Sequence, residues 1–354
     1  MVISRTPFRI SFFGGGTDYP AWYRQHGGSV LAATINKYCY LTCRYLPPFF
    51  EHRIKVVYSK IETVHTVDEI QHPAVRELLR YLSIEHGVEV HHDGDLPRRS
   101  GMGSSSSFTV GLLHALYALK GQIVGKRQLA LESIHIEQDV LKENVGSQDQ
   151  VCAAYGGVNL ISFYPNGDIS VRPVTLTPQR QRELESHLML FYTGIMRTAS
   201  DIAASFISQL AQRTETLRRM RELVDASSEI LSSAGDINEF GRLLHEAWLA
   251  KRSLSEKVSN SQVDFLYQEA LDAGAVGGKL LGAGGGGFML LFVPPEKQTA
   301  LRSRLNKLIH VPFEFEFAGS QIIFFEPGED FTEHYRARQQ QQIAAFQELE
   351  GPSV

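Results

Sequence analysis

The chain has 354 residues, of which 43% are hydrophobic and 21% charged, with a formal net charge of −4. This length exceeds that of one typical compact core and predicts two domains, and the composition is that of a globular protein. The weakly negative charge excludes a global attraction to nucleic acid or anionic lipid, so any phosphate site must be local. The three cysteines lack the spacing of a zinc site or a disulfide framework. The sequence shows no signal-peptide core and no apolar run of about 18 residues, and we expect a cytoplasmic protein.

The first half of the chain alternates β-rich and helical patterns. Residues 2–13 alternate like a strand and stop at a triple glycine, and residues 108–119 are apolar nearly all round, which predicts a buried helix. Residues 144–157, rich in Gly, Gln and Asp, are expected to form a loop. The other predicted elements are strands at 29–45, 53–59, 89–92, 158–163 and 169–174 and helices at 73–86 and 126–143.

The character of the sequence changes near residue 175, and we place the domain boundary there. Long amphipathic helices are predicted beyond it, and a glycine-rich segment leads into an apolar strand at 288–293. The predicted domains are 1–175 and 176–330, followed by a helical or flexible tail at 331–354. The remaining predicted elements are helices at 200–232, 237–259 and 261–273, one more helix before residue 312, and strands at 188–193, 312–317 and 320–325.

A segment rich in serine and glycine, Ser100–Ser107, runs directly into the apolar helix pattern. Glycines let a backbone approach an anion closely, and a helix N-terminus offers unpaired N–H groups and the positive end of the helix dipole. The hydroxyls can cap the helix, bind a phosphate oxygen or ligate Mg²⁺. A serine-rich linker is the alternative, but a linker would not lead straight into a long apolar segment, so we favour an anion site.

Two other glycine-rich segments carry weaker signals. Gly282–Gly287 matches GxGxxG, but the dinucleotide fingerprint requires a helix after the loop, whereas we expect a helix before this loop and a strand after it. This context excludes a Rossmann oxidoreductase; close helix–strand packing and a loop over a ligand stay equally open. Phe13–Tyr19 continues a strand into a glycine turn whose Asp18 is suited to binding sugar hydroxyls, and on this motif alone a structural turn is the favoured interpretation.

Two acidic residues follow the serine-rich segment in the sequence. Glu137 lies on a predicted helix and Asp149 in the loop that follows, where a carboxylate could activate a hydroxyl or bind metal; a solvated or capping role is the alternative. The sequence lacks the P-loop motif, the lysine, HRD and DFG set of protein kinases, and the GxSxG elbow of α/β-hydrolases.

Three segments together resemble the ordered motifs of the GHMP kinases (galactokinase, homoserine kinase, mevalonate kinase and phosphomevalonate kinase). They are Pro7–Tyr19, Leu96–Ser106 and Lys279–Gly287, and the resemblance extends along the chain to about residue 325. It implies an α+β fold of two domains with the nucleotide and substrate between them. The N-terminal domain would be like domain 2 of ribosomal protein S5, and the C-terminal domain would be ferredoxin-like. The implied activity is that of an ATP-dependent small-molecule kinase.

The resemblance assigns roles by position in the motifs. The second motif would bind the ATP phosphates, Ser105 and Glu137 would hold Mg²⁺, and Asp149 would act on the substrate hydroxyl with Arg9 as its basic partner. The first and third motifs would bind the substrate and the γ-phosphate side. The residues so assigned are Gly101, Met102, Gly103, Ser104, Ser105 and Ser106 for ATP, and Gly15, Gly16, Thr17, Asp18, Tyr19, Gly284, Gly285 and Gly286 for the substrate.

Within the family, the chain resembles the branch that phosphorylates D-glycero-D-manno-heptose 7-phosphate at the anomeric O1. The likeness is carried by FGGGTDYP at 13–20, GSQDQ at 146–150 and AWLAKRSLSEKVSN at 247–260. The product would be heptose 1,7-bisphosphate, on a route to nucleotide-activated heptose for surface polysaccharide. Galactokinases usually have Glu-His where Gly15-Gly16 stand, which disfavours galactose itself. Fucokinases carry a glycine-rich version of this motif and stay a rival, as does an inactive sugar-binding regulator.

A sugar that already carries a phosphate requires a second cationic site. The candidates are Arg197, in a loop that begins near Gly194, and the pair Lys251-Arg252, with Lys279 as a further one. A solvated charge on a helix is the alternative interpretation of the first three. The predicted partners are the sugar phosphate and ATP with Mg²⁺, with no nucleic acid and no membrane; a homodimer stays open.

Overall fold

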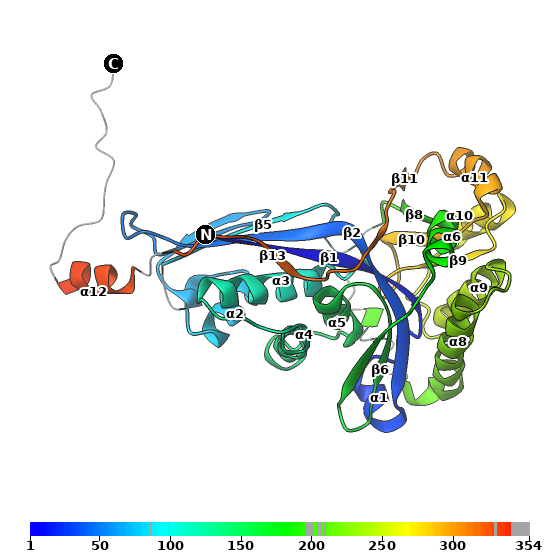
Figure 1. Ribbon diagram of the computed structural model, residues 1–354, viewed down its shortest axis with the longest axis horizontal. Helices are drawn as coiled ribbons and strands as arrows, with labels where there is room; N and C mark the ends of the chain where they lie inside the picture. Colours follow the sequence, from blue (N-terminus) through cyan, green and yellow to red (C-terminus); the bar gives the residue numbers. More distant parts are fainter. Residues whose placement is uncertain are drawn as a thin grey trace, which may run out of the picture.

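Two β-sheets with helices packed on them make up the computed structural model (Figure 1), which describes residues 1–84, 87–98, 100–195, 202, 203, 205, 207, 210–328 and 331–340. Within the described residues, the larger sheet has nine strands and the smaller has four. The larger sheet comprises β1 (Val2–Phe13), β2 (Gly28–Tyr45), β3 (Ile54–Val57), β4 (Ile61–Val64), β5 (Val88–Gly94), β6 (Val158–Phe163), β7 (Ile169–Pro173), β12 (Phe315–Glu316) and β13 (Gln321–Phe325). The smaller sheet comprises β8 (Leu188–Tyr192), β9 (Gly277–Leu280), β10 (Phe288–Phe292) and β11 (Ile309–His310).

The helices divide between the two sheets. Those of the first half are α1 (Pro20–His26), α2 (Pro73–Tyr81), α3 (Ser104–Leu119), α4 (Lys126–His135) and α5 (Gln148–Tyr155). Those of the second half are α6 (Pro178–His187), α8 (Thr214–Ser232), α9 (Asn238–Arg252), α10 (Ser261–Asp272), α11 (Gln298–Arg304) and α12 (Thr332–Gln340). Figure 1 shows α2 to α5 beneath the larger sheet and α9 to α11 around the smaller one. Among the described residues, no helix is long and apolar enough to cross a membrane.

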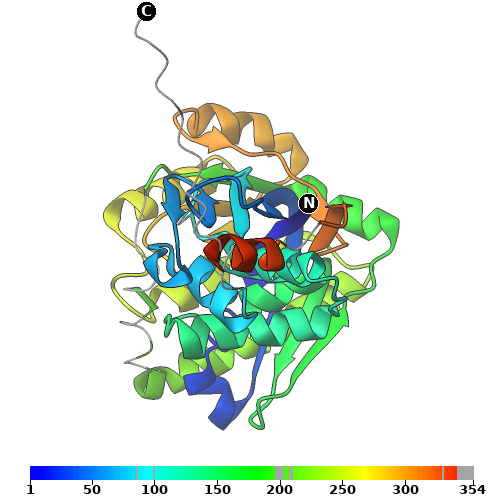
Figure 2. The same ribbon diagram turned by 90° about the vertical axis from the view of Figure 1, so that its left-hand side faces the viewer.

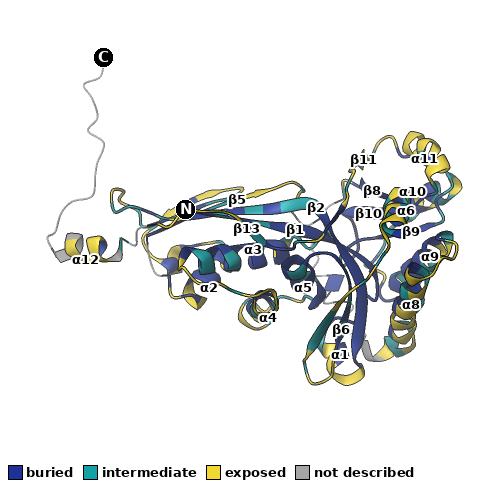
Figure 3. Ribbon diagram, viewed as in Figure 1, coloured by how far each residue is buried: buried dark blue, intermediate teal, exposed yellow. Residues whose placement is uncertain are grey.

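The larger sheet is built around β2, whose 18 residues pair antiparallel with β1, β5 and β6. Helix α3 packs beneath β1 and β2, and most of its side chains are buried, as its uniformly apolar sequence predicts. Figure 3 shows α3, α5 and β1 mostly in the dark blue of buried residues. In the first turn of α3, Ser107 is buried and its Oγ donates to Pro7 O of β1 at 2.9 Å, which ties this turn to the sheet.

Two strands that were predicted in the second domain lie in the larger sheet. β12 and β13 were expected in the second domain, at 176–330, but β13 pairs with β1 and β12 pairs with β2 in the larger sheet. Figure 2 shows this return: beyond α11, coloured orange, the chain runs back to β13 beside the N-terminus. The pairing satisfies backbone groups along the outer edge of β1, which would otherwise be unpaired.

Three predicted boundaries also change. Residues 144–157 were expected to be a loop, but residues 148–155 form the short helix α5, because Val151 and Cys152 are buried against the core. The predicted helix at 126–143 gives way to a π-helical turn at Ile136–Val140. A strand, β9, stands directly before the glycine-rich segment where a helix was expected. That segment joins β9 to β10, so the exclusion of a Rossmann fold holds.

Candidate active site

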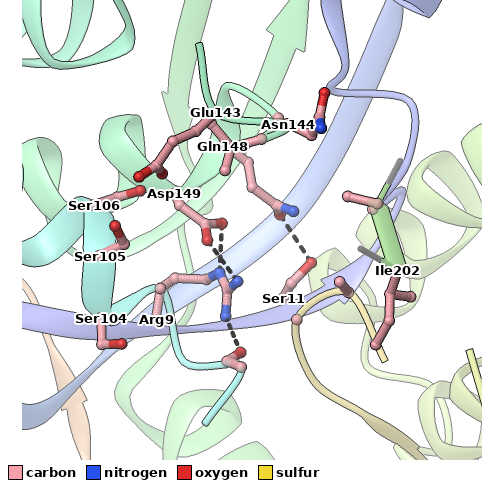
Figure 4. Close-up of a pocket in the computed structure, with 18 of the residues that line it drawn as sticks. Arg9, Ser11, Ser104, Ser105, Ser106, Glu143, Asn144, Gln148, Asp149 and Ile202 are labelled. Carbon is pink, nitrogen blue, oxygen red and sulfur yellow. Dashed lines mark hydrogen bonds and ion pairs between the residues drawn. The ribbon is translucent and has the colours of Figure 1, made fainter. Parts of the chain in front are cut away.

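A cleft with a volume of about 390 Å³ lies where loops of both sheets meet. Its walls come from the end of β1 and the loop after it, the N-terminus of α3, and residues 143–149. The second half of the chain contributes Lys251 of α9 and Lys279 and Gly282 around the end of β9. Figure 4 shows how the labelled side chains of the first group converge on this space. The structure therefore brings all three motif segments to one cavity.

The serine loop (Ser100–Ser107) ends at an open helix N-terminus. Gly103 takes the N-cap position in a left-handed conformation with φ of +72°, and no side chain of the described residues caps α3. A Cβ on Gly103 would lie 3.1 Å from Arg9 and 3.3 Å from Asp149, so this residue must be small as well as left-handed. The hydroxyls of Ser104 and Ser105 point away from the helix, at the wall of the cleft (Figure 4). Uncapped N–H groups and the helix dipole make this end of the cleft suitable for a phosphate.

Arg9 and Asp149 form a two-pronged ion pair beside that N-terminus. Arg9 Nε and Nη2 each donate to one carboxylate oxygen of Asp149 at 2.7 Å, and Nη1 donates to Gly101 O at 2.7 Å. The Arg9 side chain is 4% exposed and that of Asp149 is 24% exposed, so the Asp149 carboxylate is the more accessible partner of the pair on the side of the cleft. Burial alone lowers the pKa of Arg9, but the Asp149 carboxylate more than offsets this and raises it above its usual value.

The loop after β1 contributes a buried carboxylate. Asp18 Oδ1 accepts a hydrogen bond from Gly16 N at 2.8 Å, and burial together with the nearby Asp149 raises the pKa of Asp18 to about 6. Thr17 turns inward and donates to the carbonyl oxygens of Gly14 and Ser29, so its hydroxyl supports the loop. The residues of this loop that line the cleft are Gly15, Gly16, Asp18 and Tyr19.

Glu137 lies behind the serine loop and is fully buried. Its Oε2 accepts hydrogen bonds from Ser106 Oγ, at 2.9 Å, and from Gln150 Nε2, so the structure places Ser106 and not Ser105 against it. Among the described residues, Oε1 has no hydrogen-bond partner. Burial raises the pKa of Glu137 to about 7, against the hydrogen bonds that favour the charged form. A buried carboxylate with a free oxygen, next to hydroxyls at a phosphate site, fits Mg²⁺.

The glycine loop (Gly282–Gly287) packs against the serine loop. A Cβ on Gly101 would lie 2.6 Å from Leu281 O, and a Cβ on Gly282 would lie 2.5 Å from the Cα of Gly101. Lys251 Nζ donates to Gly282 O and Leu280 O and so holds the base of the glycine loop. The three glycines assigned to the substrate, Gly284, Gly285 and Gly286, instead pack closely against the backbone of Val258 and Ile195 and do not line the cleft.

The predicted cations separate into two groups. Lys251 and Lys279 are buried and line the cleft, and Lys279 Nζ donates to Phe12 O at 2.8 Å. Burial and the charge of Arg9 lower the pKa of Lys251 to about 7, and burial lowers that of Lys279 well below its usual value. Arg252 points elsewhere and pairs with Asp264 at 3.0 Å. Gly194 is exposed outside the cleft, and Arg197 lies outside the described residues.

Comparison with known proteins identifies the family. The sequence model of the GHMP kinases N-terminal domain matches residues 68–157, and that of the GHMP kinases C-terminal domain matches residues 220–310. A D-glycero-alpha-D-manno-heptose 7-phosphate kinase from Campylobacter jejuni is 31% identical over 318 residues, which cover 86% of this chain and 93% of that protein. The chain belongs to the GHMP kinase family. It is a sugar kinase that uses ATP.

Two other relatives match most of this GHMP kinase, one in fold and one in sequence. A solved D-glycero-D-manno-heptose 1-phosphate kinase from Bacteroides thetaiotaomicron is 24% identical and superposes with a TM-score of 0.76 over 92% of this chain and 100% of its own. At that identity the likeness shows the fold alone. A bifunctional fucokinase/GDP-fucose pyrophosphorylase from Arabidopsis thaliana is 27% identical over 87% of this chain, which spans 31% of that longer protein.

The sequence did not predict several residues that line the cleft of this GHMP kinase. At the end beyond the serine loop, His72 stacks on Phe108 with ring centroids 4.9 Å apart, and His92 meets the same ring edge-on at 5.0 Å. Glu143 also lines the cleft. None of them belongs to a glycine-rich motif, and the His91-His92-Asp93 run is typical of an exposed strand end, so only the three-dimensional fold reveals them.

Proposed function

We propose that this GHMP kinase transfers the γ-phosphoryl group of ATP to the anomeric O1 of D-glycero-D-manno-heptose 7-phosphate and so forms heptose 1,7-bisphosphate. The observation that carries the proposal is the Arg9–Asp149 pair, which lies beside the uncapped N-terminus of α3 in the same cleft as buried lysines. The similarity to the Campylobacter jejuni heptose 7-phosphate kinase supports the choice of sugar.

The N-terminus of α3 is the proposed site of the ATP phosphates. Phosphoryl transfer depends on positioning and on neutralising the charge of the γ-phosphoryl group, and backbone N–H groups at a helix N-terminus supply both. Gly101 to Ser106 would provide these donors. Ser105 and Glu137 would hold Mg²⁺, and Ser106, in the first turn of α3, donates a hydrogen bond to the Glu137 carboxylate. When bound, Mg²⁺ adds positive charge at the phosphates.

Asp149 is the proposed partner of the sugar O1. Arg9 fixes both oxygens of its carboxylate, so the carboxylate can present one oxygen to a hydroxyl in the cleft without turning. An anomeric hydroxyl is more acidic than a simple alcohol, and the proposal covers both orientation of O1 and acceptance of its proton. Asp18, held by Gly16 N, would bind other hydroxyls of the sugar.

The residues that line the cleft indicate where the nucleobase of ATP and the phosphate of the sugar would bind. The stacked rings of His72 and Phe108 offer an aromatic surface to the nucleobase of ATP. At the other side, Lys251 is the proposed partner of the phosphate on the sugar, because it is buried, lines the cleft and bonds only carbonyl oxygens among the described residues. Arg252 is left out of the proposal because it pairs with Asp264.

A test of the proposal is ADP release with Mg²⁺ against heptose 7-phosphate, unphosphorylated heptose, fucose, galactose, mevalonate and homoserine. We expect turnover with heptose 7-phosphate that Asp149→Asn abolishes. The fucokinase relatives make fucose the rival, and turnover with fucose alone would contradict the proposed substrate while leaving a sugar kinase. Nucleotide binding without turnover of any sugar would favour a sugar-binding regulator.

A further inference from the structure

Glu143 is a charged residue in the cleft that no motif assigns. It follows the π-helical turn at Ile136–Val140 and then Lys142, which has a left-handed conformation with φ of +55°. This irregular path returns the backbone to the preceding turn, where Glu143 N donates to Glu137 O at 2.8 Å. Because of this turn, two glutamates six positions apart in the chain lie near one another, Glu137 buried behind the serine loop and Glu143 at the cleft.

The side chain of Glu143 faces the proposed phosphate site. It lines the cleft together with Ser105 and Ser106, and Figure 4 shows its carboxylate pointing toward the first turn of α3, where both serines lie. Within the part of the chain that the structure describes, this carboxylate has no hydrogen bond and no basic partner, and burial alone acts on its charge. A half-buried carboxylate aimed at a triphosphate site would repel the nucleotide unless a cation lay between them.

Glu137 provides the second observation. It is fully buried, its Oε2 is bound by Ser106, and its Oε1 has no partner among the described residues. Glu143 is close enough to exert electrostatic repulsion on Glu137. The site thus holds a buried unpaired oxygen, a second unpaired carboxylate and serine hydroxyls, all of them oxygen ligands of the kind that Mg²⁺ prefers.

We propose that Glu143 is a further carboxylate ligand of the divalent cation that accompanies ATP, opposite Glu137 and beside the hydroxyls of Ser105 and Ser106. The inference rests on the proposed Mg²⁺ site at Glu137. Two carboxylates at one Mg²⁺, with phosphate oxygens completing the coordination, give a tighter site for the metal–nucleotide complex than one carboxylate does. Without the cation, the charge of Glu143 opposes binding of the nucleotide.

The test is a titration of Mn²⁺ into the enzyme with a non-hydrolysable ATP analogue, followed by the EPR signal of free Mn²⁺. Glu143→Gln should weaken Mn²⁺ binding by about 10-fold or more. Asp139→Asn is the matched control, because Asp139 lies on the same segment but pairs with His135 and is 70% exposed. The control should change the Mn²⁺ affinity less than twofold.

A second measurement separates a metal ligand from a group that contacts the nucleotide or sugar directly. In EDTA, Glu143→Gln should bind the nucleotide as tightly as the native enzyme or more tightly, because a repulsive charge is removed. Weaker nucleotide binding in EDTA, or unchanged Mn²⁺ affinity, would overturn the assignment of Glu143. Glu137→Gln in the same titration tests the underlying site: if it weakens Mn²⁺ binding and Glu143→Gln does not, only the present inference fails, and if neither does, both fail.

Discussion

The Arg9–Asp149 pair allows the sharpest test of the proposed catalytic centre. Asp149→Asn keeps the shape of the side chain, so one of its two hydrogen bonds with Arg9 can persist, but it removes the negative charge opposite a buried guanidinium. Loss of one partner of a fully buried pair costs about 3–5 kcal/mol. The Asp149 side chain is 24% exposed, so we expect about 2–3 kcal/mol and a Tm lower by roughly 5–10 °C.

The two single variants should be strongly coupled. Arg9→Met should lower the stability by a similar amount, because Asp149 and Gly101 O lose their donor. The double variant should lose less than the sum of the single variants, with a coupling energy of about 2 kcal/mol. The exposed pair Arg219–Glu246, with the same 2.7 Å separation, is the control and should show a coupling below about 1 kcal/mol.

The effect of Asp149→Asn on kcat should be much larger than its effect on stability would explain. Asp149→Asn should lower kcat by about 10²–10⁴-fold, in the range for loss of a general acid–base group, with ADP affinity within twofold of the native value. Calorimetric melting and steady-state kinetics on the native enzyme, the two single variants and the double variant measure these stabilities and rates. Additive stabilities for Arg9→Met and Asp149→Asn, or a kcat within about tenfold of the native enzyme in Asp149→Asn, would refute the reasoning.

Three further predictions concern the rest of the cleft. Lys251→Met should raise KM for heptose 7-phosphate about 10–100-fold, since hydrogen bonds to charged groups are worth about 1.5–3 kcal/mol. An equal rise in KM for unphosphorylated heptose would show that Lys251 only holds the glycine loop. Gly101→Ala should weaken ADP binding, because its Cβ would meet Leu281 O at 2.6 Å, whereas Gly125→Ala has open space and should leave equilibrium dialysis with ADP unchanged. Burial raises the pKa of Glu137 from 4.5 to about 7, so the metal-free folded protein binds a proton that the unfolded chain releases. This proton contributes about 3 kcal/mol to the free energy of unfolding below pH 4.5, and the contribution is lost as the pH rises through 7. Glu137→Gln should flatten this part of the pH profile of urea unfolding. An unchanged slope would contradict the raised pKa of Glu137.

The sequence predicts the phosphate end of the site well because local chemistry defines it. Glycines that let the backbone approach an anion, serines at a helix start and an apolar helix behind them are all readable from Ser100–Leu119, and the structure has the helix where it is expected. The long strand β2 and the strand β1 are likewise predicted nearly to the residue, since both carry strong β patterns. The assignments of Arg9 and Asp149 to one pair came from the family resemblance, and the geometry joins them.

What the sequence could not predict depends on contacts between distant segments. Lys251 and Arg252 are neighbours on α9, yet successive helical residues point about 100° apart, and only packing decides which one faces the cleft. The return of β12 and β13 to the first sheet depends on a free strand edge far away in the chain. Glu143 reaches the site through a π-helical turn and a left-handed lysine, for which no sequence pattern is diagnostic.

Transfer to the anomeric O1 can be tested by ³¹P NMR of the product formed from ATP, Mg²⁺ and heptose 7-phosphate. We expect ADP and a sugar with two phosphate resonances, one coupled to the anomeric proton at C1 and one to the protons at C7. A phosphate on any other carbon, or ADP formed without a bisphosphorylated sugar, would contradict transfer to O1 beside Asp149.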